Sequence, residues 1–179
     1  NVIAYDPFIS EEAANRLGIE LVSLDDLYKR SDFISIHVPL TNETKNMVDA
    51  KACSKMKKRV KLINCASGGI VNERDLCDAI KKGIVSGAAF DVFEKEPTPA
   101  DNPLLQMEEV ILTPHLGAST FEAQENVAIA IAEQIAGYLS KGTIRNAVNV
   151  PSVPTELLLT LGQYINLAEK LGSLQGQML

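Results

Sequence analysis

The chain has 179 residues, of which 46% are hydrophobic and 22% are charged, a composition typical of a globular protein and not of a disordered one. Lys and Arg number 17 against 23 Asp and Glu, and the net charge of −6 argues against a nucleic-acid-binding protein, whose surface is basic. No apolar run approaches the 18 residues of a membrane-spanning helix, so no membrane partner is expected.

Short apolar runs alternate with helical patterns over the first two thirds of the chain. The runs predict strands, several of which are followed by Pro or Gly-Gly, at 2–5, 19–22, 33–38, 60–65, 87–93 and 110–113. Apolar spacing and capping residues predict helices at 10–18, 23–28, 49–58 and 72–83. Strands that alternate with helices at these lengths indicate an α/β domain with a parallel sheet.

The pattern changes after residue 118. A capping box of Ser119 and Glu122 opens a predicted helix that ends before Gly142. The segment 147–154 (AVNVPSVP) is expected to be an extended linker, and 155–178 an amphipathic helix whose apolar face is too large to stand alone. The first of these helices is expected to turn one stripe toward a core: Val127, Ile131, Ile135 and Tyr138.

Cysteine and histidine usage predicts neither a disulfide framework nor a metal site. Three cysteines are an odd number, no Cys-x-x-Cys occurs, and the two histidines lie far apart in the sequence. A reducing compartment is therefore expected, the cytoplasm in the first place, with a plastid as the alternative.

Polar residues at the predicted strand ends are the candidates for chemistry, because open parallel sheets bind ligands there. Asp6 either accepts hydrogen bonds from a ribose diol or closes a turn with its own side chain. Gly68 and Gly69 either let the backbone approach a ligand or form a tight loop. Both alternatives stay open for each.

His115 is either a solvated ring or a proton carrier, with Glu96 holding one tautomer of the imidazole and raising its basicity. His37 lies at an apolar strand end and is expected to be structural. Cys65 has no basic neighbour close in sequence and is expected to pack rather than to act as a nucleophile.

Four segments occur in a characteristic order: 37–44 (HVPLTNET), 62–73 (LINCASGGIVNE), 89–97 (AFDVFEKEP) and 113–120 (TPHLGAST). Together they resemble the nucleotide-binding domain of the D-isomer-specific 2-hydroxyacid dehydrogenases. Residues 115–124 and 168–172 are similar to the members that oxidise 3-phosphoglycerate. The resemblance implies a Rossmann-like, doubly wound parallel sheet and NAD-linked oxidation of 3-phosphoglycerate to 3-phosphohydroxypyruvate, the entry to serine synthesis.

The resemblance also implies roles for individual residues. His115 would be the acid/base on the substrate hydroxyl, with Glu96 as its partner. Asp6 would bind the adenosine ribose hydroxyls and so favour NAD over NADP, and Asp91 would hold the nicotinamide carboxamide. The further cofactor contacts would be Val38 and Pro39 on the adenosine side, Cys65, Ala66 and Ser67 at the nicotinamide ribose, and His115, Leu116, Gly117 and Ala118.

Two features depart from the family's pattern. The family has arginine where this chain has Ser67, and that guanidinium grips the substrate's carboxylate and keto oxygen. Serine lacks the charge and the reach, so we expect about 10² to 10³ less activity, as for a lost transition-state donor.

The second departure is the absence of a Gly-x-Gly-x-x-Gly loop and of the strand that precedes it. That strand is central in the usual order, so the predicted strands at 2–5 and 33–38 should face a gap. We therefore expect a fragment, with a partial NAD-binding domain over 1–146 and, over 147–179, a linker and helix that lead to a substrate or regulatory region. Alone, such a fragment should bind NAD poorly and be inactive.

Three functions stay open. The first is NAD-dependent oxidation of 3-phosphoglycerate, which the tail after Pro151 favours because it looks like the link to a regulatory region. The second is a non-catalytic NAD-binding or regulatory module, which Ser67 favours. The third is another D-2-hydroxyacid dehydrogenase, acting on hydroxypyruvate, glycerate or formate. The helix at 155–178 is expected to pack on a missing domain or on a second subunit, and the family resemblance implies a homo-oligomer, for which the helix at 119–141 offers further surface.

Overall fold

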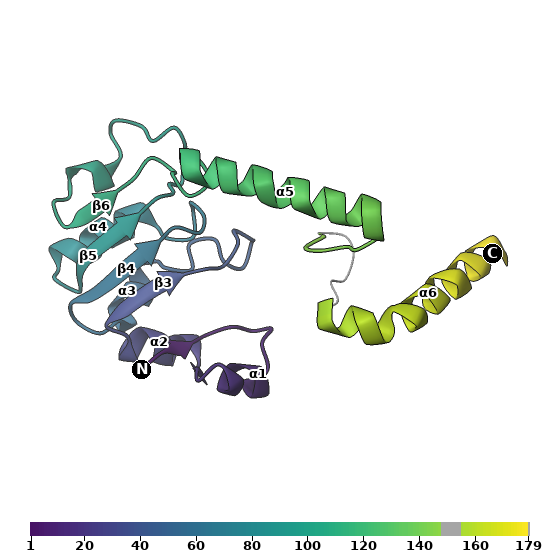
Figure 1. Cartoon of the computed structure of the whole chain (residues 1–179). Coiled ribbons are helices and arrows are strands. Elements are labelled where there is room, and N and C mark those ends of the chain that lie inside the picture. Colours follow the sequence, from purple (N-terminus) through teal and green to yellow (C-terminus); the bar gives the residue numbers. More distant parts are fainter. Residues whose placement is uncertain (148–154, 179) are drawn as a thin grey trace. The chain divides into compact units, whose positions relative to one another are not determined.

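Strands and helices alternate through residues 1–120 in the predicted order (Figure 1). The computed structural model describes residues 1–147 and 155–178, without the side chains of 155–159 and 178. Residues 1–120 form one compact unit and residues 121–179 another. The elements of the first unit are β1 (Ile3–Ala4), α1 (Glu11–Arg16), β2 (Glu20–Leu21), α2 (Leu24–Arg30), β3 (Phe33–Ile36), α3 (Ala50–Lys55), β4 (Val60–Asn64), α4 (Glu73–Lys81), β5 (Val85–Phe90), the 3-10 helix η1 (Pro103–Gln106) and β6 (Val110–Leu112).

The strands form two separate parallel sheets. Four strands lie in the order β3-β4-β5-β6, and β1 pairs with β2 alone. A hollow of about 440 Å³ separates the two sheets, lined by 2–6 from one side and 33–38 from the other. The predicted Rossmann-like parallel sheet is confirmed, and so is the predicted gap between its first strand and the strand at 33.

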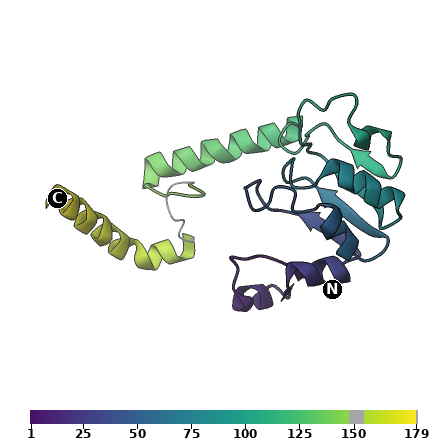
Figure 2. The same ribbon diagram turned by 180° about the vertical axis from the view of Figure 1, so that it is seen from behind.

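The core lies on one face of the four-stranded sheet. Helices α2, α3 and α4 pack there, and Figure 2 shows α3 and α4 in front of the strands when the unit is seen from behind. Leu62 of β4 and Leu76 of α4 are fully buried. On the other face Phe33 and Ile111 are exposed, and the Lys61 ammonium lies 4.9 Å from the centre of the Phe33 ring.

The helices of the first unit begin at the residues whose side chains predicted them. Ser10, Ser23 and Asn72 each accept a hydrogen bond from the backbone N–H three residues further on, as N-capping residues do. Gly18 and Gly83 follow α1 and α4 with φ near +69°, the left-handed conformation that ends a helix.

Some predicted ends are wrong. The helix predicted to reach residue 58 ends at Lys55, because the N–H of Lys57 donates to the Tyr28 carbonyl instead of continuing the helix. The strand predicted over 87–93 runs from Val85 to Phe90, because the N–H groups of Phe93 and Glu94 donate to side-chain carboxylates and not to a neighbouring strand. The short helix η1 was not predicted.

The second unit contains two long helices, α5 (Phe121–Lys141) and α6 (Thr155–Met178). Both were predicted, and Gly142 directly follows α5 with φ +64°. No residue of α5 is buried. The prediction that its apolar stripe faces a core is therefore wrong for this chain, where Val127, Ile131, Ile135 and Tyr138 are about half exposed. Of the predicted linker, residues 148–154 lie outside the described residues.

Candidate functional site

The register of the four-stranded sheet brings the candidate loops to one edge. Ile36, Asn64, Phe90 and Leu112 are aligned across the four strands. The alignment continues one residue further, because the N–H of Asp91 donates to the Asn64 carbonyl at 3.1 Å and the N–H of Thr113 to the Phe90 carbonyl at 3.0 Å. The loops that carry Ser67, Asp91 and His115 therefore leave the sheet side by side.

His115 and Glu96 form a hydrogen-bonded pair at this edge. Nδ1 of His115 lies 2.7 Å from Oε2 of Glu96, whose other oxygen accepts the N–H of Phe93 at 3.0 Å. An ionised carboxylate only accepts hydrogen bonds, so the proton of the neutral ring sits on Nδ1. Nε2 then keeps its lone pair and is free to take a proton from a bound hydroxyl group. The pair predicted from sequence is present.

The pairing shifts the proton affinity of both groups. The hydrogen bond that the ring donates to Glu96 and the charge of that carboxylate raise the pKa of His115 above its ordinary value, and Asp91 adds to the effect. The hydrogen bond from His115, with that from the Phe93 N–H, lowers the pKa of Glu96. The imidazole therefore holds its proton to a higher pH than an isolated ring does.

Asp91 anchors the segment that carries His115. Its Oδ1 accepts the Thr113 hydroxyl at 2.6 Å and the Leu116 N–H at 2.7 Å, and its Oδ2 accepts the Gly117 N–H at 3.0 Å. Desolvation acts to raise the pKa of Asp91, but these hydrogen bonds outweigh it and leave the pKa below its ordinary value. These contacts hold His115 in a left-handed conformation with φ +53°, which is uncommon for a residue other than glycine.

The contacts of Asp91 differ from the role that the family resemblance implies for it. Three donors of the chain itself bind the carboxylate, two at Oδ1 and one at Oδ2. The cofactor role of Asp91 therefore stays a prediction. Thr113 was not singled out from sequence, because a threonine at a strand end carries no signal of its partner.

The loop after β4 is shaped by Asn64. Its buried side chain accepts the Ala66 N–H at 3.1 Å and donates to the Ser67 carbonyl at 3.0 Å, which turns the chain sharply at the strand end. Cys65 is exposed on this turn, so the prediction that it packs in the interior is wrong. Ala66 is exposed and Ser67 half-buried at the same edge.

Gly68 brings this loop against the segment of Glu96. A Cβ atom at residue 68 would lie 1.8 Å from the carbonyl oxygen of Phe93, a contact no side chain allows. Only glycine therefore fits there without a shift of one of the two backbones. This glycine allows close packing between two loops of the site, which neither of the two alternatives considered for the Gly-Gly pair had specified.

The adenosine-side candidates line the hollow between the two sheets. Asp6 and Val38 border it from opposite sides, together with His37. Oδ1 of Asp6 accepts the N–H groups of Phe8 at 2.8 Å and Ile9 at 3.3 Å, so the turn-closing function is confirmed; the ribose function stays a prediction.

His37 and the remaining candidates for cofactor contact lie at the surface. His37 directly follows β3; its Nε2 lies 2.8 Å from the hydroxyl of Ser35 in that strand, and the ring is exposed. Pro39 is exposed and its carbonyl accepts the Thr44 hydroxyl. Leu116, Gly117 and Ala118 are exposed next to His115.

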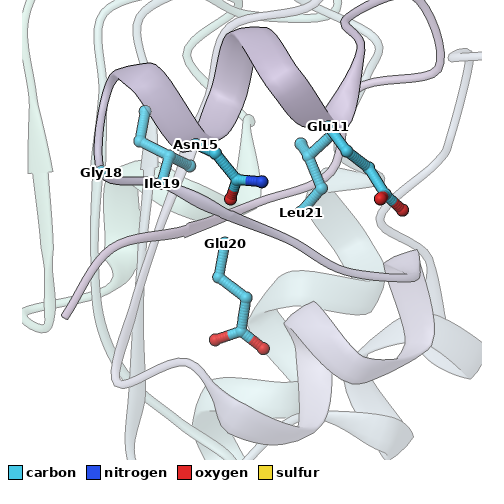
Figure 3. A pocket seen from close by; sticks show the side chains of 6 residues that line it. All are labelled: Glu11, Asn15, Gly18, Ile19, Glu20 and Leu21. Carbon is cyan, nitrogen blue, oxygen red and sulfur yellow. The ribbon is translucent and has the colours of Figure 1, made fainter.

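A second hollow of about 460 Å³ lies between α1 and β2 and is lined by Glu11, Asn15 and 18–21 (Figure 3). Figure 3 shows the Glu20 side chain on the side of the strand away from Asn15. Its carboxylate accepts two hydrogen bonds from Arg30, each of 2.8 Å. None of the predicted site residues lines this hollow, and it adds nothing to the site.

Comparison with known proteins decides the family. The profile described as "D-isomer specific 2-hydroxyacid dehydrogenase, NAD binding domain" matches residues 1–117. The chain belongs to this family. The match ends just after His115, so it includes the pair with Glu96 and all four of the aligned strand ends. The resemblance inferred from the four motifs is confirmed.

Three of the similar curated proteins are named for the same enzyme of this dehydrogenase family. The chain is 48% identical to the D-3-phosphoglycerate dehydrogenase of Synechocystis sp. over 99% of its own length and 32% of the relative. It is 47% identical to that of Methanocaldococcus jannaschii, over 100% of the chain and 34% of the relative. The chloroplastic D-3-phosphoglycerate dehydrogenase 2 of Arabidopsis thaliana is 50% identical over 99% of the chain and 28% of the relative. The chain thus spans about a third of the curated relatives it matches.

Solved structures agree on the fold. A glyoxylate reductase from Paecilomyes thermophila superposes with a TM-score of 0.69 at 29% identity, over 83% of the chain and 45% of that protein. The NAD-dependent formate dehydrogenase of Staphylococcus aureus, solved in complex with NAD, gives a TM-score of 0.65 at 33% identity, over 83% and 44%.

The chemistry of the site residues suits the two ends of NAD: the Asp6 carboxylate is an acceptor of the kind that ribose hydroxyls need, and the Asp91 carboxylate is an acceptor close to His115. The hollow that Asp6 and Val38 border is the gap between the two sheets. The sequence has no Gly-x-Gly-x-x-Gly loop for the pyrophosphate between the two ends of NAD. Among residues 1–147 and 155–178, no helix combines the length and the apolar character that spanning a membrane requires.

Proposed function

We propose that this chain is the NAD-binding and acid/base part of an enzyme that oxidises 3-phosphoglycerate to 3-phosphohydroxypyruvate, the first step of serine biosynthesis. The observation that carries the proposal is the His115–Glu96 pair at the carboxyl edge of the parallel sheet, in a dehydrogenase NAD-binding domain. Identity of 42 to 50% to D-3-phosphoglycerate dehydrogenases, over nearly the whole chain, supports this substrate over those of the solved neighbours.

The chain's own residues supply the proton chemistry. Glu96 holds the Nδ1–H of His115, so Nε2 faces outward as the base for the hydroxyl proton of the substrate. The positive charge that forms on the ring is stabilised by Glu96 and Asp91. Bound NAD would supply the hydride acceptor. Asp6 and Val38 on the adenosine side, and Ala66 and Asp91 on the nicotinamide side, would hold it.

Ser67 favours a second candidate, a non-catalytic NAD-binding or regulatory module. Family members carry arginine at this position to bind the substrate, and Ser67 lies half-buried where its short side chain projects no charge. A module of this kind keeps the nucleotide fold and loses turnover.

A chimaera separates the two candidates. Residues 1–179 replace the matching third of the Methanocaldococcus jannaschii enzyme, and 3-phosphoglycerate-dependent formation of NADH is measured with Ser67 and with Ser67→Arg. The enzyme proposal predicts an increase of about 10²-fold or more with arginine, the size of a restored transition-state donor. It also predicts that His115→Gln abolishes that gain. A folded Ser67→Arg chimaera with no gain in rate would establish the module instead.

The proposal extends to the setting of the enzyme. Free cysteines at 53, 65 and 77 favour a reducing compartment, the cytoplasm or a plastid, and two of the relatives are named chloroplastic. The exposed apolar residues of α5 and α6 favour a homo-oligomer.

A further inference from the structure

The segment that carries Glu96 is held at its base by a buried acidic residue to which the sequence analysis assigned no role. Glu73 is the first residue of α4 and only 7% of its surface is exposed. Its Oε1 accepts the N–H of Glu94 at 2.7 Å, and its Oε2 accepts Nδ2 of Asn102, also at 2.7 Å. One carboxylate thus binds both ends of the loop between residues 94 and 102.

The far end of this loop is fixed in the core. Asn102 is 5% exposed, and its Oδ1 accepts the N–H of Leu104, a fully buried residue. The N–H of Asn102 donates to the Pro99 carbonyl at 3.0 Å. Both ends of the side-chain amide therefore have partners that depend on its present orientation, and the side chain is not free to exchange its amide oxygen and nitrogen.

The near end lies against the loop of Ser67. Because Gly68 packs directly on the Phe93 carbonyl, the peptide between Phe93 and Glu94 lies between Gly68 and the Glu73 carboxylate. Glu96 comes two residues after Glu94, and its carboxylate accepts the N–H of Phe93 and the Nδ1–H of His115. The position of this peptide therefore determines where the Glu96 carboxylate lies.

We propose that Glu73 is a positioning residue of the site: its buried carboxylate, bound to Glu94 and Asn102, holds Glu96 within hydrogen-bond distance of Nδ1 of His115. This rests on the proposed function, in which that pair carries the proton. Burying a carboxylate costs free energy unless hydrogen-bond donors surround it. The N–H of Glu94 and the NH₂ group of Asn102 both point at Glu73, so residue 73 must offer two acceptor atoms. A glutamine offers only one acceptor, and its NH₂ group would face the NH₂ group of Asn102.

The test is the titration of His115 by NMR in the 179-residue chain, with His37→Gln used for assignment because the sequence has only two histidines. The charged groups that act on the His115 ring are Glu96 and Asp91. Glu96→Gln gives the reference for a ring without its partner. We expect Glu73→Gln to lower the midpoint more than halfway from the wild-type value to that reference.

Two further variants separate positioning from charge and from stability. Asp78→Asn removes an exposed acid from the same helix and should leave the midpoint unchanged. Glu73→Gln combined with Asn102→Asp reverses the direction of one hydrogen bond and keeps the net charge. The introduced glutamine then donates to the introduced aspartate, which still accepts the Leu104 N–H, and this double variant should restore the wild-type midpoint.

The outcomes are distinct. If Glu73→Gln leaves the midpoint at the wild-type value and only lowers the unfolding temperature, Glu73 is merely structural and the inference is wrong. If Glu73→Gln does not fold, Glu73→Asp takes its place, since the shorter side chain withdraws from the Glu94 N–H; an unchanged midpoint there overturns the inference equally. If Glu96→Gln itself has no effect on the midpoint, the acid/base pair of the proposed function fails first.

Discussion

At the scale of single residues, the site depends on carboxylates whose acceptor positions are filled by the chain itself. Asp91, Glu96 and His115 could be singled out from the sequence, because they follow two predicted strands whose ends lie side by side in a parallel sheet. It was not enough to predict Thr113 or Glu73, because their importance lies in partners 22 and 21 residues away in the chain. Glu73 after Asn72 looks in sequence like an ordinary acid in a first helical turn.

Replacing Asp91 should destabilise the fold. Asp91→Asn replaces one carboxylate oxygen by an NH₂ group. That group then faces a backbone N–H that the oxygen accepts in the wild-type chain, so one donor is left unsatisfied. We expect a loss of about 1–3 kcal/mol in the free energy of unfolding at pH 7, measured by urea denaturation. Asp78→Asn, on the exposed side of α4, should stay within about 0.5 kcal/mol of wild type. Equal losses in the two variants would contradict the anchoring role.

The same carboxylate predicts a pH dependence. The pKa of Asp91 is lowered in the folded state, so its contribution to stability is present above the unfolded pKa of about 3.9 and is lost as the pH falls through the folded value. The difference in unfolding free energy between wild type and Asp91→Asn should therefore shrink as the pH is lowered from 5 toward 2. A difference that stays constant over this range would show that the charge of Asp91 is not involved.

At the scale of elements, the beginnings of helices were predictable and some ends were not. A capping side chain acts on its own helix within three residues, so sequence contains the whole interaction. After β5 the N–H groups bind side chains instead of a neighbouring strand: that of Phe93 donates to Glu96, three residues on, and that of Glu94 to Glu73, 21 residues away in the chain. The apolar stripe predicted on α5 shows another limit of sequence patterns, because periodicity identifies an apolar helix face but not which part of a protein covers it.

Two glycines make a matched test of loop packing. Gly68→Ala forces a Cβ against the Phe93 carbonyl and should cost about 1–3 kcal/mol or more in unfolding free energy. Gly137→Ala, in the middle of α5 with no atom within 4 Å of the new Cβ, should stabilise its helix by about 0.5–1 kcal/mol. Thermal unfolding followed by circular dichroism measures both. A neutral Gly68→Ala would mean that the loops of Ser67 and Glu96 are not packed together as described.

At the scale of the whole chain, two parallel sheets face one another across a hollow, and the polar groups gather at the carboxyl ends of their strands. The separation of β1 from β3 was predicted, because the family's usual strand order places between them a strand that this sequence lacks. In the proposal, the described residues bind the adenosine end and the nicotinamide end of NAD. They include no glycine-rich loop that could bind the two phosphates between those ends.

The chain of 179 residues should for this reason bind NAD weakly, with a dissociation constant well above that of the Methanocaldococcus jannaschii enzyme measured in the same titration calorimetry experiment. Loss of a helix N-terminus and its backbone donors removes the main attraction for the pyrophosphate. Equal affinity of the two proteins would show that the chain holds the phosphates by groups outside this account.

The central claim is that Glu96 fixes the proton of neutral His115 on Nδ1 and leaves Nε2 free as the base. The ring ¹⁵N chemical shifts of His115, recorded above its titration midpoint, report directly which nitrogen carries the proton. The account predicts the Nδ1–H tautomer in the wild-type chain and its loss in Glu96→Gln. A wild-type ring protonated on Nε2 would contradict it.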